Sequence, residues 1–111
     1  MSKEHLGEFE ELVLLMIILL EADAYGLAIR KALKEHANRT VTIGAVHGTV
    51  NRLQSKGFIA SKLGGASESR GGRQKRLFTI TTEGKQMLQR SREMKLSLWG
   101  KIPELAVENF K

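Results

Sequence analysis

Residues 43–81, IGAVHGTVNRLQSKGFIASKLGGASESRGGRQKRLFTIT, carry the clearest structural pattern in the chain. Their first part spaces apolar residues at helical intervals, which predicts a helix from about Ile43 to Lys56. Residues 58–65 and 75–81 alternate as strands do, and a loop rich in glycine and serine separates them. Two strands joined by a loop of about ten residues predict a β-hairpin. The stretch therefore predicts a helix followed directly by a hairpin.

The predicted helix 43–56 has two unlike faces. At 100° per residue, its buried stripe comprises Ile43, Val46, Val50, Leu53 and Gly57. Its opposite face comprises Gly44, Gly48, Asn51 and Ser55, with His47 and Arg52 at the flanks. A glycine inside a helix costs about 1 kcal/mol relative to alanine, so this face needs a reason. Small residues there would let a DNA major groove approach the backbone closely, or would let the helix pack tightly within the protein.

The hairpin loop and the strand after it are strongly cationic. Their cations are Arg70, Arg73, Lys75 and Arg76, with Gly71 and Gly72 among them. Glycines without a Cβ let a backbone approach phosphates, and arginine and lysine bind them. This pattern favours a nucleic-acid contact, whereas the alternative interpretation is a solvated hairpin tip that has no partner.

Helices are predicted on both sides of this stretch. Residues 6–22 predict a helix that is apolar on every face from Leu12 to Leu20, so it must be covered all round. It is either simply the central helix of the core or also covered in part by a second subunit. Residues 23–26 form a turn, with Asp23 as a candidate cap, and helix 26–37 follows. Thr81 or Thr82 caps a last helix that runs to about Trp99.

This order of elements predicts a mainly α (α+β) fold, a winged helix-turn-helix. It has three helices, a two-stranded β-wing and a C-terminal helix. In such a fold the third helix enters the major groove and the wing crosses the backbone or minor groove. We expect one compact unit, with the DNA-binding part at 1–82 and a C-terminal dimerisation helix at 83–111.

The charge of the chain is unevenly distributed. The net charge is +6, yet residues 1–24 carry −5, so the remainder carries +11. A basic body suggests an anionic partner, either nucleic acid or an anionic membrane. The chain has no cysteine, which excludes disulfides and thiolate chemistry. The apolar run Leu12–Leu20 is too short to span a bilayer and follows an acidic segment, unlike a signal peptide, so we expect a cytoplasmic protein without a membrane partner.

Three segments resemble the PadR family of transcriptional regulators in its short form. They are EELVLLMIILLEADAYGLAI (10–29), VTIGAVHGTVNRLQSKGFI (41–59) and GGRQKRLFTITTEGK (71–85). The chain departs from the family pattern at residues 45–48, where His47 and Gly48 replace the usual Tyr and Pro. The resemblance implies a bacterial homodimeric repressor whose C-terminal helix packs against the first helix of its partner.

Residue types suggest roles in DNA binding. His47 and Asn51 can hydrogen-bond to base edges, and asparagine suits adenine. Gly44 and Gly48 would permit close approach. Arg52 is a phosphate clamp or one half of an ion pair. Arg70, Arg73, Lys75 and Arg76 are expected at phosphates or in the minor groove, and Tyr25 either reaches a phosphate or packs at the helix junction.

Apolar residues of the first and last helices suggest a dimer interface, which is also a candidate pocket for a small planar apolar effector. They are Leu12, Met16, Leu19, Met94, Leu98 and Trp99. The alternative for Trp99 is simple packing. No metal site is expected, because His5, His36 and His47 lack acids at ligand spacing, and no cofactor is expected.

An enzyme is the least favoured class, because the sequence has no paired carboxylates with a histidine, phosphate-binding glycine motif or nucleophile elbow. Besides a DNA-binding regulator, a winged-helix module that binds protein or RNA stays open.

Overall fold

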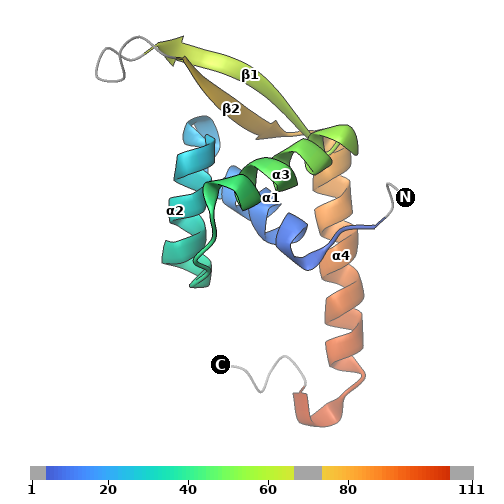
Figure 1. Ribbon diagram of the computed structural model, residues 1–111. Helices are drawn as coiled ribbons and strands as arrows, with labels where there is room; N and C mark the ends of the chain where they lie inside the picture. Colours follow the sequence, from blue (N-terminus) through green and yellow to red (C-terminus); the bar gives the residue numbers. More distant parts are fainter. Residues whose placement is uncertain (1–4, 67–73, 106–111) are drawn as a thin grey trace.

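The computed structural model describes residues 5–66 and 74–105 of the 111-residue chain. Four α-helices lie within these ranges: α1 (Glu8–Leu20), α2 (Gly26–Ala37), α3 (Ile43–Ser55) and α4 (Thr82–Gly100). The strands β1 (Ile59–Ala66) and β2 (Gln74–Ile80) form an antiparallel hairpin between α3 and α4 (Figure 1). Single 3₁₀ turns follow α1 at Glu21–Asp23 and α4 at Pro103–Leu105. This order confirms the predicted winged helix-turn-helix.

α1 is the central helix of the core and contacts α2, α3, α4 and β2. It spans fewer residues than the predicted 6–22 and ends where Glu21 takes a positive φ of 54°. The protomer covers only part of its apolar surface. Val13 and Leu14 are fully buried, whereas Leu15 and Ile18 are more than 40% exposed. The prediction that α1 needs more cover than one chain supplies therefore fits the structure of the protomer.

The two helices of the helix-turn-helix, α2 and α3, begin in different ways. α2 has the predicted bounds, but Asp23 does not cap it: Tyr25 occupies the N-cap position, and its N–H donates to the Asp23 carbonyl oxygen at 3.0 Å. The capping prediction was wrong because residues 21–23 are already folded as a 3₁₀ turn. Thr42 caps α3 by accepting a hydrogen bond from the Ala45 N–H at 3.0 Å.

Gly57 follows the end of α3. The sequence had suggested that it belongs to the buried stripe of this helix, and that prediction was wrong. It is exposed and has a φ of 83°, a conformation that glycine adopts without strain. The Gly57 N–H donates to Gln54 and the Phe58 N–H to Leu53, which is the pairing of a Schellman motif. This turn aims the chain from the end of α3 straight into β1.

The hydrophobic core gathers residues from all four α-helices and from both strands or the residues beside them. Its members are Val13, Leu14, Met16, Ile17, Ala24, Ile29, Ala32, Leu33, Val46, Val50, Leu53, Phe58, Ile59, Phe78 and Met87. Val46, Val50 and Leu53 confirm three positions of the predicted stripe on α3, and Ile43 is partly buried beside them.

The hairpin is fixed to the helices along β2. Ile59 pairs with Ile80 and Ser61 with Phe78, and the register shifts between Leu63 and Ala66. On its other edge, β2 receives the segment before α2: the Phe78 N–H donates to the Ala24 carbonyl oxygen at 2.8 Å. The base of the wing is therefore a rigid extension of the helix-turn-helix.

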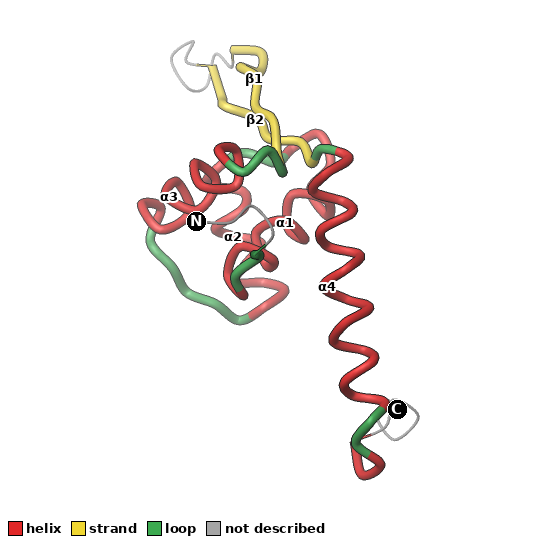
Figure 2. The backbone as a smooth tube through the Cα atoms, turned by 90° about the vertical axis from the view of Figure 1, so that its right-hand side faces the viewer, coloured by secondary structure: helices red, strands yellow, loops and turns green. Residues whose placement is uncertain are grey.

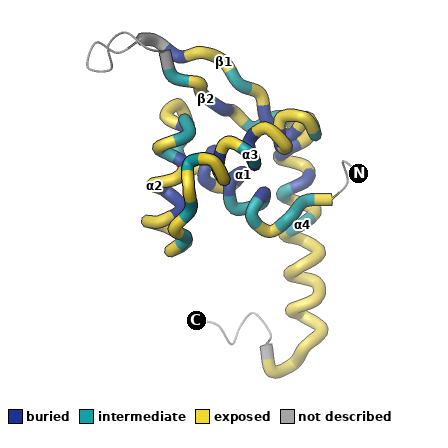
Figure 3. Tube along the Cα trace, in the orientation of Figure 1, coloured by how far each residue is buried: buried dark blue, intermediate teal, exposed yellow. Residues whose placement is uncertain are grey.

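α4 joins the hydrophobic core only through its first turns. Thr81 caps the helix by accepting from the Gly84 N–H at 3.1 Å, which confirms one of the two predicted caps. Gly84 and Met87 are buried, whereas residues 92–100 are all exposed (Figure 3). α4 runs well beyond the other helices (Figure 2). Its outer half therefore contributes no residue to the hydrophobic core of this chain.

Candidate nucleic-acid interface

The outward face of α3 carries the residues that the sequence predicted for base contact. Gly44, His47 and Asn51 are exposed and Gly48 is partly exposed, whereas Val46, Thr49, Val50 and Leu53 face the core. Gln54, which the sequence did not single out, is also exposed and lies one turn after Asn51 on this side. The helix therefore presents a polar surface of small and amide side chains.

Packing within the protein does not account for Gly44 and Gly48. A Cβ added to Gly44 would come no closer than 3.8 Å to Thr42, and one on Gly48 no closer than 3.7 Å to Arg52, both ordinary contact distances. By contrast, a Cβ on Gly84 would lie 2.3 Å from the Phe58 carbonyl oxygen. Gly84 is required by the fold, whereas the two glycines of α3 leave an open surface.

His47 lies against the start of α2. A Cβ added to Gly26 would be 3.2 Å from the His47 Cε1 atom, so the small residue at position 26 makes room for the imidazole. The ring is nevertheless exposed. Gly26 therefore helps to set where His47 sits on the outward face, a relation between distant residues that the sequence did not reveal.

The strand β2 places two of the predicted cations, and they lie in different surroundings. The Lys75 Nζ atom lies 4.2 Å from the centroid of the Tyr25 ring, a cation–π distance. Tyr25 is partly buried and pairs with Leu77 through its backbone. Of the two roles considered for Tyr25, the structure shows packing at the junction. The Tyr25 ring therefore holds the Lys75 side chain by this cation–π contact.

Arg76 faces α3. Its Nη1 donates to the Asn51 Oδ1 at 3.3 Å, its Nη2 to the Gln54 Oε1 at 2.6 Å and its Nε to the Ser61 hydroxyl at 3.3 Å. The guanidinium carbon also lies 5.0 Å from the centroid of the Phe78 ring. In this structure Arg76 therefore joins the wing to α3. The sequence predicted only that Arg76 would contact a phosphate or the minor groove, and did not predict these hydrogen bonds.

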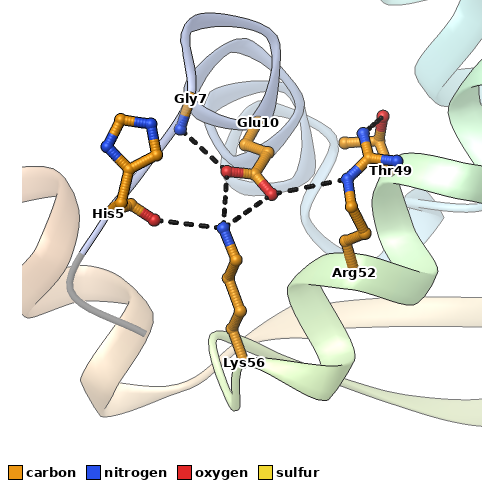
Figure 4. A network of polar contacts seen from close by, with 6 residues as sticks. All are labelled: His5, Gly7, Glu10, Thr49, Arg52 and Lys56. Carbon is orange, nitrogen blue, oxygen red and sulfur yellow. Dashed lines mark hydrogen bonds and ion pairs between the residues drawn. The ribbon is translucent and has the colours of Figure 1, made fainter. Parts of the chain in front are cut away.

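A buried carboxylate ties α1 to the end of α3. Figure 4 shows Glu10 accepting from the Lys56 Nζ at 2.9 Å and from the Gly7 N–H at 2.8 Å. Burial alone would raise the pKa of Glu10, but the Gly7 N–H, Lys56 and Arg52 together lower it. The carboxylate is therefore held ionised where the C-terminal end of α3 meets α1.

Arg52 takes part in the same network. Its Nε lies 3.6 Å from Glu10, and its Nη2 donates to the Thr49 hydroxyl at 3.0 Å (Figure 4). The structure shows the ion pair considered for Arg52, and the phosphate contact stays a prediction. Its side chain is still 59% exposed, so it lies at the surface beside the outward face of α3.

Four of the predicted DNA-contacting residues lie outside the described part of the chain. They are Arg70, Gly71, Gly72 and Arg73.

The face shared by α1 and α4 is apolar and open. Leu19, Met94, Leu98 and Trp99 are exposed on it, as the interface prediction requires. Met16 is a correction: it is only 5% exposed and packs in the core, because it lies on the inner side of α1. Leu12 is likewise partly buried against the core. The sequence missed Leu15, Ile18, Leu96 and Ile102, which are all exposed on these two helices or just after α4.

A groove of about 510 Å³ runs between α1 and α4. Its apolar lining consists of Leu15, Ile18, Leu88, Leu96 and Trp99. Glu11 forms part of its rim and binds α4 by accepting from the Ser91 hydroxyl at 3.2 Å and by an ion pair with Lys95. Trp99 lines this groove and Met16 does not. The predicted effector pocket, formed by Trp99 and its symmetry mate, stays a prediction.

Within the described ranges, no helix combines the length and the apolar character that a membrane crossing requires.

A helix-turn-helix, a cation-bearing hairpin and an open polar third helix define a winged helix-turn-helix regulator. Residues 14–90 match the model of the transcriptional regulator PadR-like family, and the chain belongs to this family of DNA-binding transcriptional regulators.

Solved structures share the fold. A PadR family transcription regulator from Clostridium difficile is 28% identical, with a TM-score of 0.62 over 88% of this chain and 93% of that one. A PadR family regulator from Eggerthella lenta is 23% identical, with a TM-score of 0.66 over 85% and 79%. The complex structure of hsRosR-S4 is 25% identical, with a TM-score of 0.67 over 87% and 76%. Among curated proteins, no sequence matches the chain significantly.

Proposed function

We propose that this protein is a homodimeric repressor that binds a palindromic DNA operator in the cytoplasm and is released from it by a small apolar effector. The observation that carries the DNA-binding part is the outward face of α3. Gly44 and Gly48 have no packing reason to be glycine, and they flank His47 beside the exposed Asn51. A major groove is wide enough to admit one helix, and small side chains let that helix lie deep.

The cations of this surface support phosphate binding on either side of the groove. Lys75 lies on the wing strand β2, and Arg52 is exposed near the end of α3. Arg70 and Arg73 follow in the sequence of the wing and would add to the same contacts. Phosphate contacts supply most of the affinity of such proteins without reading the sequence.

The apolar face of α1 and α4 supports dimerisation. Seven large apolar residues of these two helices are exposed: Leu15, Ile18, Leu19, Met94, Leu96, Leu98 and Trp99. Contiguous exposed apolar surface is costly in water and marks an interaction site. In the proposed dimer, residues 83–111 act as the dimerisation segment, and α4 packs on α1 of the partner.

A two-fold dimer would place two α3 helices about one turn of DNA apart, ~34 Å. The operator is then a palindrome, because each half-site meets the same surface. The groove beside Trp99 supports the effector part of the proposal, because its volume of about 510 Å³ falls in the range of small-molecule sites. Quenching of the single tryptophan by planar aromatic compounds, absent in Trp99→Phe, tests this part.

The salt dependence of duplex binding tests the DNA-binding part. Several phosphate contacts per dimer make the logarithm of the affinity fall steeply with the logarithm of salt concentration. A flat dependence, or no duplex binding at low salt, contradicts the proposal and favours a module that binds protein or RNA. Asn51→Ala should reduce discrimination between sequences, whereas Lys75→Met should weaken all sequences alike.

A further inference from the structure

The contact between Arg76 and α3 constrains the chemistry that α3 can offer to a base. Arg76 lies on β2, 25 residues after Asn51 in the sequence, yet its Nη1 donates to the Asn51 Oδ1 at 3.3 Å. Its Nη2 donates to the Gln54 Oε1 at 2.6 Å. Both amides belong to the exposed side of α3. One guanidinium therefore holds the two amide side chains that are best placed for base contact.

A guanidinium has five N–H donors and no acceptor. An amide that meets it must therefore present its carbonyl oxygen, whichever way the side chain would turn alone. The amide NH2 group then lies on the other side of the planar group, directed away from Arg76. Because both Asn51 and Gln54 meet the same cation, both have this orientation. The Ser61 hydroxyl reinforces it by donating to the Gln54 Oε1 at 3.2 Å.

The guanidinium is itself held in place by the base of the wing. It lies 5.0 Å from the ring of Phe78, which is 1% exposed and whose N–H binds the Ala24 carbonyl oxygen. Its Nε donates to Ser61 on β1, the residue that pairs with Phe78. A planar guanidinium held by a cation–π contact and by a hydrogen bond to the neighbouring strand loses less freedom per hydrogen bond than a lysine would. Arg76 is therefore a built part of the α3 surface.

We propose that Arg76 determines the hydrogen-bond polarity of the DNA-reading face. This inference rests on the proposed DNA-binding function and specifies which base edges the face accepts. With both carbonyl oxygens engaged, Asn51 and Gln54 offer N–H donors to the major groove. Donors suit the N7 and O6 of guanine and the O4 of thymine, whereas adenine presents its N7 acceptor beside an N6 donor that an amide NH2 group cannot pair with. The bidentate pairing of an amide with adenine also needs the carbonyl oxygen to accept from N6. The Gln54 Oε1 already accepts from Arg76 and Ser61, and the Asn51 Oδ1 has one of its two lone pairs taken by Arg76, so Arg76 disfavours this pairing.

The test is selection of duplexes from a random-sequence pool with four proteins: wild type, Asn51→Ala, Arg76→Lys and Lys75→Met. Asn51→Ala identifies the operator positions that Asn51 reads, because discrimination is lost there. At these positions the wild type should prefer guanine or thymine over adenine by about tenfold. Arg76→Lys keeps the charge but lacks the planar, five-donor guanidinium that holds both amides and Ser61, so this preference should fall to about parity. Lys75→Met, the control on the same strand, should weaken binding without changing the preference.

Each outcome bears on a separate statement. If the wild type enriches no duplex, the proposed function fails, and this inference fails with it. If a duplex is enriched but Arg76→Lys selects the same bases at the Asn51 positions, the inference alone is overturned. A wild-type preference for adenine there, or no position that depends on Asn51, also overturns it.

A measurement on the unmodified protein guards against a variant that fails to fold. Proton NMR of the free protein should show separate, slowly exchanging signals for the Arg76 guanidinium, because its nitrogens are held by three acceptors. A single averaged signal would show that the guanidinium turns freely, which would remove the basis of the proposal.

Discussion

The α3 face and the α1/α4 face are both open in the described part of the chain, but they differ in the side chains that they expose. On the α3 face Asn51 and Gln54 already have a partner within the protein, Arg76, and two positions of the face are glycines. On the α1/α4 face large apolar side chains such as Leu15 and Trp99 remain in solvent. Small residues and fixed amide side chains suit the polar groove of a DNA duplex. Large exposed apolar side chains suit the apolar surface of a second protein chain. The comparison indicates that assembly and recognition use separate parts of one small chain.

Leu15→Glu should break the α1/α4 face and give the largest effect. Leu15 is 41% exposed and lines the groove beside Trp99, so a carboxylate there would be buried in the proposed dimer. We expect a monomer in sedimentation analysis. Affinity for a two-half-site duplex should fall by about a hundredfold or more, because the two half-sites are no longer coupled.

Leu27→Glu is the matched control for this change. Leu27 is 49% exposed on α2, away from the α1/α4 face, so this variant should stay dimeric. A Leu15→Glu variant that remains dimeric would contradict the assignment of the face.

Glu10→Gln tests the connection between the two surfaces. Glu10 is 5% exposed, and its loss leaves the partly buried Lys56 without its counter-charge, so we expect a loss of about 3 kcal/mol in the free energy of unfolding. Denaturant unfolding at pH 7 measures this. Glu8→Gln is the control: Glu8 binds Arg39 at an exposed site, so its replacement should cost much less.

The pH dependence of stability gives a second measure of the same carboxylate. The pKa of Glu10 is lowered in the folded protein from its ordinary value of 4.5. Its contribution is therefore present above the unfolded pKa and is lost as the pH falls through the lower folded pKa. Glu10→Gln should show less acid destabilisation below about pH 4.5 than the wild type. An unchanged acid profile would contradict the importance of this pair.

Gly48→Ala should separate stability from recognition, with the smallest effect. A Cβ fits at this position, so the fold should gain about 1 kcal/mol from higher helix propensity. The same methyl group stands on the α3 face, so duplex affinity should fall by about tenfold. Thermal unfolding and duplex titration measure the two effects.

Gly84→Ala is the opposite case and serves as the control. Its Cβ would lie 2.3 Å from the Phe58 carbonyl oxygen, so it should destabilise the fold. If Gly48→Ala binds DNA as tightly as the wild type, close approach at this glycine is not needed.

Local patterns predicted the elements but not the contacts between distant segments. α2 has the predicted bounds, and Val46, Val50 and Leu53 were placed correctly, because helical periodicity is written in adjacent turns. The inward position of Met16 was missed because an all-apolar run gives no sign of which side meets the core. The Glu10–Lys56 pair joins residues 46 apart, and no local signal announces such a pair.

The lack of a local signal for contacts between distant segments also explains what the sequence missed at Arg76 and left open at Gly44. Arg76 was recognised as a cation of the wing, but its hydrogen bonds to α3 depend on how the hairpin folds back. The glycines of α3 left two interpretations open in the sequence. Only the space around each Cβ position excludes internal packing as their reason.

Selection of duplexes from a random-sequence pool by the wild-type protein tests both surfaces together. The α3 face requires that a defined duplex be enriched, and the α1/α4 face requires that it contain two inverted half-sites. The account predicts a palindrome whose half-site centres are about 10 base pairs apart. Enrichment of a single non-repeated half-site would contradict the dimer, and enrichment of no duplex would contradict DNA recognition by α3.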